Sequence, residues 1–503
     1  MKKLKCACLD GLDATGVDVE ATFTKGLPSF SIVGLANSSI QESKDRVKSA
    51  LLVNEFKFPP LKITINLSPS DIAKSGTHFD LPIALLVALQ NEKSVDFKDF
   101  FVFGELGLDG ALKDTKSIFV LILSLAQAGL IKNVLVPNDS VKKISKIPNI
   151  NVYGVQTLSG AIDFFKFSNK ENFKKDIEDF NYDCINVKER NYFYDTHYAL
   201  DFSDVKGQVL AKKAALIASA GNHNIMFEGS PGCGKSMITK RLRFILPPMS
   251  LEEILEKAKL DSLDVVEPDF SPTRVFRSPH HSSTKASIFG GGSTIAKIGE
   301  IALSNNGMLF FDELPHFGKP ILEALREPLE DHKILISRVN SKVNYPTKFM
   351  FVGALNPCPC GNLLSTKKEC RCNDVEVSRY KNRLSDPFLD RMDLFVVMNE
   401  VTSDDKTDVS SYELHQKVLN AFTMQKRRGQ SELNGKLNDE DINKYCILKD
   451  ESQEILNKAI QTYTLSFRGI NKILKVSRTI ADLAMCENIE KSHVLEALSY
   501  RKR

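Results

Sequence analysis

Residues 229–236 read GSPGCGKS, which matches the phosphate-binding pattern G-x-x-x-x-G-K-[ST] at every fixed position. In such a loop the glycines let backbone N–H groups surround phosphate oxygens at a helix N-terminus. Lys235 would neutralise the outer phosphates, and the hydroxyl of Ser236 would bind Mg²⁺. The expected nucleotide-binding set is the whole loop: Gly229, Ser230, Pro231, Gly232, Cys233, Gly234, Lys235 and Ser236.

The flanking residues suit this loop. An apolar run, HNIMFEG, precedes it and is typical of a buried parallel strand. The residues after it, MITKRLRFIL, can continue as a helix. The sequence therefore predicts the strand, turn and helix that a phosphate-binding loop requires.

Two further apolar runs end in polar side chains. The run GMLFFDEL, at 307–314, ends in adjacent carboxylates, of which Asp312 would join the Mg²⁺ site and Glu313 would polarise the attacking water. The run KFMFVGALN ends at Asn356, whose amide could orient that water against the γ-phosphate. A strand ending in Asp-Glu is common, and Asn356 alone could mark a simple turn. After a complete phosphate loop, however, the set favours ATP hydrolysis.

Arg391 lies in DPFLDRMDLF, directly before a fourth apolar run. Arginines in such turns usually make surface ion pairs. We interpret Arg391 as an arginine finger, which would contact the γ-phosphate held by a neighbouring subunit. The reason is the order of the motifs, which is the order that an AAA+ ATPase requires.

Four cysteines, Cys358, Cys360, Cys370 and Cys372, form two C-x-C pairs in the loop 358–372, which lies within NPCPCGNLLSTKKECRC at 356–372. Four thiolates satisfy a tetrahedral structural Zn²⁺ site. Ordinary reduced thiols are the alternative. Zinc bound here would be structural and would clamp the loop that follows Asn356.

Composition sets broad limits. The chain has 503 residues, 42% of them hydrophobic, which suits roughly three packed domains. No apolar run approaches the ~20 residues that span a bilayer, and the N-terminus lacks a secretory signal. We therefore expect a cytoplasmic protein without a membrane partner. The net charge of +4, from 67 basic and 63 acidic residues, neither supports nor excludes DNA binding.

The pattern of strands and helices suggests an order of domains. Residues 1–165 mix strand-like and helical patterns and predict an α/β domain, and the charge-dense stretch 166–199 is interpreted as a linker. Residues 200–400 carry the ATP motifs. From 401 to 503 the pattern is helical, with Leu414, Val418 and Phe422 on one face of a helix.

Several motifs together resemble the magnesium-chelatase-like AAA+ ATPases of the YifB/ComM family. They are GSPGCGKS, FRSPHHSSTKASIFGGGSTIAKIGEIALSNNGMLFFDELPHF, LEALREPLE, ISR, NPCPCG and LSDPFLDRMDL. The N-terminal segments LPSFSIVGLANSSIQESKDRVKSAL and GELGLDGAL match too, so the likeness covers nearly the whole chain. The resemblance implies a Lon-protease-like (ribosomal S5 domain 2-like) α/β domain. An AAA+ P-loop α/β core with a parallel sheet and a C-terminal helical lid would follow. The best-described branch of the family is a hexameric DNA helicase that promotes branch migration during natural transformation.

A Lon-like fold does not by itself imply proteolysis. Lon-type cleavage needs a serine activated by a lysine. Gly76, beside Ser75, stands near the nucleophile position, and Phe119 stands near the lysine position, although Lys113 and Lys116 are close in sequence. We therefore expect no peptidase activity.

Two insertions would serve DNA binding. The segment RSPHHSSTKASIFGGGSTIAKIGE lies where the resemblance implies a loop inserted in the second AAA+ helix. The segment DHKILISRVNSKVNYPTKF alternates at Ile334 and Ile336 as a two-stranded hairpin does, and such hairpins point into the central pore of related ring motors. His280 and His281 in the first could be a structural pair or could touch substrate. We expect Lys285, Lys297, Arg338 and Lys342 to contact DNA phosphates. In the lid, Arg468 stands where related motors place a γ-phosphate-sensing arginine, and Arg478 is its competitor.

The leading interpretation is an ATP- and Mg²⁺-dependent motor, a homohexamer that moves single-stranded or branched DNA through its pore, with recombination proteins as partners. One alternative is a chelatase-type motor that remodels a protein for metal insertion. Another is a regulatory scaffold that binds ATP without turnover. The complete set of Lys235, Asp312, Glu313 and Asn356 argues against the scaffold.

Overall fold

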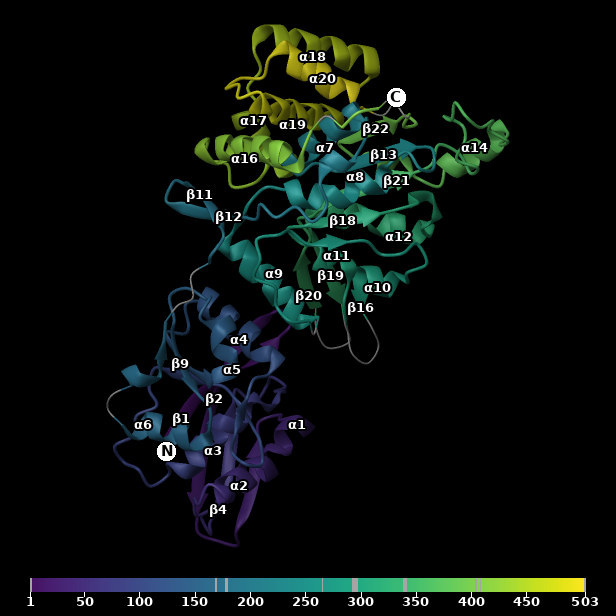
Figure 1. Cartoon of the computed structure of the whole chain (residues 1–503). Coiled ribbons are helices and arrows are strands. Elements are labelled where there is room, and N and C mark those ends of the chain that lie inside the picture. Colours follow the sequence, from purple (N-terminus) through teal and green to yellow (C-terminus); the bar gives the residue numbers. More distant parts are fainter. Residues whose placement is uncertain are drawn as a thin grey trace. The chain divides into compact units, whose positions relative to one another are not determined.

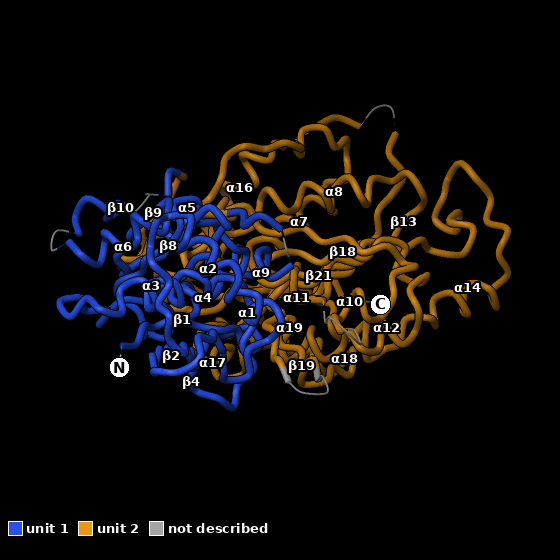
Figure 2. Tube along the Cα trace, turned by 90° about the horizontal axis from the view of Figure 1, so that it is seen from below, with its two compact units in different colours: residues 1–181, 258–269 blue, residues 182–257, 270–503 orange. Residues whose placement is uncertain are grey.

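The computed structural model describes residues 2–167, 170–176, 180–264, 266–291, 297–337, 342–402, 405–407 and 409–501, with the backbone alone for Ser337 and Lys342. It divides into two compact units (Figure 2). The first comprises residues 1–181 and 258–269, and the second comprises 182–257 and 270–503. Each unit is described by itself.

The first unit is built on an eight-stranded mixed sheet with the strand order β10-β9-β8-β5-β1-β2-β4-β3. Strands β9, β8, β5 and β1 run parallel, whereas β1, β2 and β4 are antiparallel neighbours. The strands are β1 (Lys2–Asp10), β2 (Asp13–Thr24), β3 (Ser29–Val33), β4 (Lys62–Ser68), β5 (Phe100–Val102), β8 (Asn133–Pro137), β9 (Asn151–Val155) and β10 (Lys174–Lys175). Alternate residues of β4, Ile63, Ile65 and Leu67, are buried, as a one-sided core requires.

Helices complete the first unit: α1 (Ser38–Gln41), α2 (Ser43–Val53), α3 (Asp80–Ala88), α4 (Lys116–Gln127), α5 (Asn138–Ile144) and α6 (Leu158–Lys166), with a small ribbon of β6 (Glu105–Leu106) and β7 (Leu112–Lys113). Phe119, which stands near the Lon lysine position, is fully buried in α4. Ser75 is exposed. The absence of peptidase activity stays a prediction.

The second unit contains a five-stranded parallel sheet with the order β15-β18-β21-β13-β22 (Figure 1). Its strands are β13 (Ile225–Gly229), β15 (Phe276–Arg277), β18 (Met308–Phe311), β21 (Met350–Leu355) and β22 (Leu394–Met398). Every residue of β18 and of β21 is buried. Continuous apolar runs of this kind belong to parallel strands that are covered on both faces. The predicted α/β class with a parallel ATPase sheet is confirmed.

The helices of the core are α7 (Val209–Gly221), α8 (Lys235–Leu242), α9 (Leu251–Leu263), α10 (Lys285–Phe289), α11 (Glu300–Leu303), α12 (Lys319–Ala324), α13 (Arg326–Asp331), α14 (Asp374–Lys381) and α15 (Asp386–Leu389). Residues 183–194, within the stretch that lacks clear periodicity, form an antiparallel pair of β11 (Asp183–Val187) and β12 (Arg190–Tyr194), and β14 (Met249–Ser250) joins it. Most side chains of β11 are exposed, which explains why the sequence shows no apolar alternation there.

The C-terminal region is helical, as predicted. It consists of α16 (Ser411–Arg427), α17 (Asp439–Tyr445), α18 (Asp450–Tyr463), α19 (Phe467–Leu483) and α20 (Lys491–Ser499). Leu414, Val418 and Phe422 are buried together on one face of α16, which confirms the amphipathic pattern. A capping box of Ser410 and Glu413 starts this helix.

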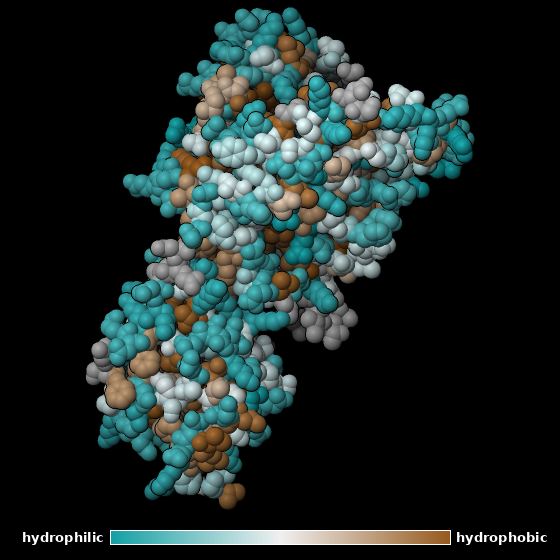
Figure 3. All heavy atoms as spheres, in the orientation of Figure 1, coloured by the Kyte–Doolittle hydropathy of each residue, from teal (hydrophilic) through white to brown (hydrophobic). Residues whose placement is uncertain are grey.

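The described helices are all too short or too polar to cross a membrane. The face of the molecule in Figure 3 is largely hydrophilic, with hydrophobic residues in small, separate patches. Small scattered patches are normal for a folded protein surface.

Candidate ATP site

The phosphate-binding loop joins β13 to α8. Gly232 and Gly234 have φ angles of 82° and 96°, in the left-handed region that glycine adopts without strain. Helix α8 begins at Lys235, with Gly234 as its N-cap. The predicted order of strand, turn and helix is therefore present, and the backbone N–H groups at the start of α8 are available to an anion.

Lys235 and Asn356 meet at the edge of the sheet. The amine of Lys235 donates to the carbonyl of Ser230 and to Oδ1 of Asn356, each at 3.1 Å. Asn356 directly follows β21, which is the neighbour of β13 in the sheet. The carboxyl ends of adjacent parallel strands thus bring these side chains together, as expected for ligand sites in such sheets.

Ser236 and Asp312 form the candidate Mg²⁺ site. The hydroxyl of Ser236 donates to Oδ2 of Asp312 at 2.9 Å, and Asp312 directly follows β18. A hydroxyl and a carboxylate are the hard oxygen ligands that Mg²⁺ prefers. These two residues therefore fit the metal that a phosphate-binding loop implies.

Glu313 is half exposed beside this pair and has a left-handed backbone, with φ of 50°. Such a conformation costs free energy in a non-glycine residue and is often found at functional sites. One carboxylate oxygen of Glu313 lies 3.8 Å from Nδ1 of His281. His281 also packs on His280, with ring centroids 4.1 Å apart. His281 thus lies close to Glu313 and also packs on His280, and its role stays open.

Tyr380 of α14 is a neighbour of the site that the sequence analysis did not identify. Burial raises the pKa of Tyr380 to about 12, so that its hydroxyl stays protonated. Lys381, next in α14, forms a 3.1 Å ion pair with Glu228 at the end of β13. Neither residue belongs to a recognisable motif, and only the fold brings α14 to this edge of the sheet.

Arg391 and Arg468 lie together, and both form ion pairs with Glu330 of α13. Within the described residues of one chain, neither arginine contacts Lys235, Asp312 or Glu313. The roles of Arg391 as an arginine finger and of Arg468 as a γ-phosphate sensor stay predictions. Glu330 ends the segment LEALREPLE, and nothing in this segment indicates that the glutamate pairs with two arginines.

Arg478 is fully buried in α19, and its guanidinium donates to Asp482 and to the carbonyls of Cys486 and Glu487. These bonds anchor the C-terminal end of the helix. Arg468 is about half exposed at the start of the same helix. Of the two candidate sensors, Arg468 is therefore the one with an exposed side chain, and its role as a sensor stays a prediction.

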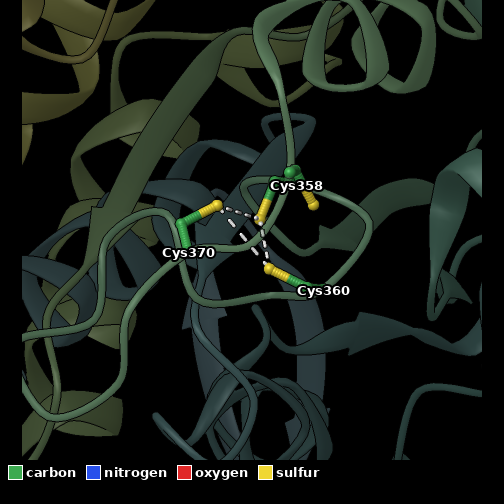
Figure 4. A group of neighbouring side chains, drawn as sticks. Cys358, Cys360 and Cys370 are labelled. Carbon is green, nitrogen blue, oxygen red and sulfur yellow. Dashed lines mark hydrogen bonds between the residues drawn. The ribbon is translucent and has the colours of Figure 1, made fainter.

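The cysteine quartet comes together in space. The sulfur atoms of Cys358, Cys360 and Cys370 point toward one another and lie 3.4 to 3.7 Å apart (Figure 4). With Cys372 added, all four sulfurs lie within 4.8 Å of one another. A Zn–S distance of about 2.3 Å in a tetrahedron requires sulfurs about 3.8 Å apart. The four thiols therefore fit a structural Zn²⁺ ion.

The cysteine loop combines thiols that influence one another's pKa with a close contact to the phosphate-binding loop. Backbone N–H groups of Asn362 and Arg371 lower the pKa of the Cys360 thiol to about 6, whereas desolvation and the neighbouring thiols raise the pKa of Cys370 and raise that of Cys372 to about 12. Gly361 packs so closely on Pro231 that a Cβ atom added to this glycine would lie 2.6 Å from Cδ of the proline. The cysteine loop thus rests directly on the phosphate-binding loop.

The two insertions pack against each other. The first contains α10 and the pair β16 (Gly290–Gly291) and β17 (Lys297–Ile298), and the second is the predicted hairpin of β19 (Lys333–Ser337) and β20 (Lys342–Pro346). A Cβ atom at Gly290 would lie 2.7 Å from Cδ1 of Ile336. Lys285 and Lys297 are exposed on the first insertion. Arg338 and the side chain of Lys342 lie outside the described residues.

Comparison with known proteins identifies relatives over almost the full length. Three family models match the chain. The model of subunit ChlI of Mg-chelatase matches residues 19–140, and the model of magnesium chelatase subunit ChlI matches residues 201–406. The model of the C-terminal part of magnesium chelatase subunit ChlI matches residues 408–501. The chain is 38% identical to the competence protein ComM of Haemophilus influenzae over 500 residues, which cover 98% of this chain and 95% of that protein. It is 36% identical to the uncharacterized protein YifB of Salmonella typhimurium, with the same coverage of 98% and 95%.

A more distant match is the maternal DNA replication licensing factor mcm6 of Xenopus tropicalis. It is 21% identical over 256 residues, which cover 46% of this chain and 29% of that protein. This likeness is confined to about half of the chain.

Proposed function

Since this chain belongs to the YifB/ComM family of magnesium-chelatase-like proteins, we propose that it is a Mg²⁺-dependent AAA+ ATPase that forms a hexameric ring and moves DNA. Its task would be branch migration in recombination or natural transformation. The observation that carries the ATPase proposal is the convergence of Lys235, Ser236, Asp312 and Asn356 at one edge of the parallel sheet. The relative named for competence and the distant replication factor support DNA as the substrate.

In this proposal each side chain has a distinct role in hydrolysis. Lys235 exchanges its bonds to loop carbonyls for the β- and γ-phosphates of ATP. Mg²⁺, held by Ser236 and Asp312, would neutralise charge that develops on the phosphate oxygens. Glu313 accepts a proton from the attacking water, and Asn356 orients that water. Catalysis then depends on positioning and electrostatic stabilisation.

Arg391 and Arg468 are proposed to complete the ATP site of the neighbouring subunit. Both arginines pair with Glu330, so the core arginine and the lid arginine lie next to each other in the protomer. Positive charge at the γ-phosphate stabilises the transition state of phosphoryl transfer. Hydrolysis would therefore require assembly, and isolated protomers would be nearly inactive.

DNA contacts are proposed at the two packed insertions, through Lys285, Lys297, Arg338 and Lys342. Four phosphate contacts per subunit would make binding strongly dependent on salt. The cysteine quartet is proposed to hold a structural Zn²⁺ ion, which would fix the loop that supports Pro231 and follows Asn356.

A chelatase-type motor, which remodels a protein partner for metal insertion, is the second candidate. The observation that favours it is the match of all three family models to magnesium chelatase subunit ChlI. The near full-length match to a competence protein favours the DNA motor.

The deciding experiment measures the ATPase rate with no DNA, with single-stranded DNA and with branched DNA, using Glu313→Gln as the inactive control. Stimulation by DNA is the expected result. An ATPase rate that neither DNA changes would contradict the DNA proposal. Stimulation by a protein partner alone would favour the chelatase-type motor.

A further inference from the structure

The carboxylate of Glu330 joins two arginines from distant segments. Its Oε2 accepts a hydrogen bond from Nη2 of Arg391, and its Oε1 accepts one from Nη2 of Arg468. Glu330 lies in α13, Arg391 follows α15, and Arg468 lies in the first turn of α19. One carboxylate thus lies between two positive charges, and displacement of Glu330 would break the ion pairs of both arginines at once.

In this arrangement the side chain of Arg391 is withdrawn from solvent. Only 10% of its side chain is exposed. Its Nη1 donates to the carbonyl of Pro387, its Nη2 donates to Glu330, and its Nε is buried without a hydrogen-bond partner within the described chain. Nη1 and Nη2 are thus each hydrogen-bonded within the chain, and the guanidinium has to leave Glu330 before it can extend to a phosphate on a neighbour.

The position of Glu330 also connects the arginines with the insertions. Helix α13 ends at Asp331, and the hairpin strand β19 begins two residues later at Lys333. A cavity of about 600 Å³ is lined by Lys285 of the first insertion, Ile336 of the hairpin, Glu330 and Arg391. Movement of the hairpin would therefore act directly on the segment that carries Glu330.

We propose that Glu330 is a positioning residue that holds Arg391 withdrawn, and that DNA on the insertions releases this arginine toward the neighbouring ATP site. This inference rests on the proposed DNA motor and deepens it, because it supplies the link between DNA binding and hydrolysis. Glu330 itself touches no reacting atom. Its effect on the rate is exerted through Arg391.

The test compares ATPase rates with and without saturating DNA. Glu330→Gln removes the charge and keeps the shape of the side chain, so the DNA-free rate is expected to rise about two- to fivefold, the range allowed by a partly exposed ion pair. The DNA-saturated rate is expected to stay the same, so that the stimulation ratio falls. Glu327→Gln removes an exposed charge one turn earlier in α13 and should keep the wild-type ratio. In an Arg391→Ala background the increase should disappear.

A DNA-free rate that is unchanged or lower in folded Glu330→Gln would overturn the inference, as would an increase that persists without Arg391. Thermal unfolding establishes that each variant is folded. If Glu330→Gln is not folded, Glu330→Asp replaces it, because a side chain shorter by one methylene cannot span both arginines and should raise the DNA-free rate too. If DNA does not change the ATPase rate of the wild-type protein, the proposed function itself is contradicted. That measurement is made before any variant is prepared, so the two failures can be distinguished.

Discussion

The amine of Lys235 lies 3.1 Å from the amide oxygen of Asn356, although 121 positions separate the two residues in the chain. Strands β13 and β21 are neighbours in the parallel sheet, so the residue after one strand meets the loop after the other. This relationship gives the candidate ATP site its main testable feature. Binding and hydrolysis should be separable by substitution on either side of this contact.

Lys235→Ala should weaken ATP binding, because the loop loses the charge that neutralises the outer phosphates. Asn356→Ala should leave binding nearly unchanged and lower kcat by about 10- to 100-fold, because it removes a group that acts on the attacking water. Binding of a fluorescent ATP analogue and steady-state hydrolysis measure the two effects. Equal losses of binding in both variants would contradict the separate roles.

Glu313→Gln should retain ATP and lower hydrolysis by about 10²- to 10⁴-fold, since an amide cannot accept the proton of the attacking water. The ring should then be trapped with ATP bound, which size-exclusion chromatography with light scattering can detect. Glu228→Gln, at the end of β13, is a control that removes a carboxylate paired with Lys381. A Glu313→Gln variant that hydrolyses ATP at the wild-type rate would exclude this residue as the base.

The cysteine quartet predicts one zinc ion per chain by elemental analysis. Cys360→Ser with Cys370→Ser should remove the metal and lower the melting temperature by several degrees, because structural zinc sites contribute folding free energy. It should also impair ATP hydrolysis, since Gly361 of this loop packs on Pro231. Cys184→Ser, an exposed cysteine of β11, is the matched control. Protein that carries no zinc while all four thiols remain reduced would refute the site.

His332 predicts a pH dependence of stability. Burial, followed by the positive charges of Lys436, Lys475 and Lys348, lowers the pKa of His332 from 6.5 to about 3. At a pH between these two pKa values, His332 is protonated in the unfolded chain and neutral in the folded chain. The free energy of unfolding therefore falls as the pH drops below about 6.5. The contribution is at most about 1.4 kcal/mol per pH unit.

His332→Asn tests this directly, because asparagine tolerates the left-handed backbone at this position, where φ is 53°. The loss of unfolding free energy between about pH 7.5 and about pH 5.5 should be smaller in the variant by about 1 kcal/mol. Denaturant titrations at both pH values measure it. His78 and His415, whose pKa values burial lowers to about 4, titrate in both proteins and cancel in the difference. An equal loss in the two proteins would contradict the assignment to His332.

Sequence motifs predicted the parts of the site that depend on local chain geometry. The phosphate-binding loop requires only a strand, two glycines with positive φ and a helix start, and all of these are encoded within residues 225–242. Asp312 and Asn356 could be predicted as site residues because each follows an apolar run, and the carboxyl ends of parallel strands lie at one edge of the sheet. The spacing of the cysteines likewise indicated a cluster.

The contacts of Glu330 could not be predicted in this way. Its partners, Arg391 and Arg468, lie 61 and 138 positions away, and an exposed glutamate on a short helix carries no local signal. The contact of Gly361 with Pro231 and the position of Tyr380 depend in the same way on tertiary packing. The difference in burial between Arg468 and Arg478 could not be predicted either, because both residues occupy the same helix, α19.

The central claim is that each ATP site is completed by the arginine of an adjacent subunit, and mixing two inactive variants tests it most directly. Lys235→Ala lacks a functional loop but keeps Arg391, whereas Arg391→Ala keeps the loop and lacks the finger. Each variant alone should be nearly inactive, and rings assembled from both should recover part of the wild-type ATPase rate. Mixed rings that assemble and stay inactive, or an Arg391→Ala protein that hydrolyses ATP at the wild-type rate by itself, would contradict the claim.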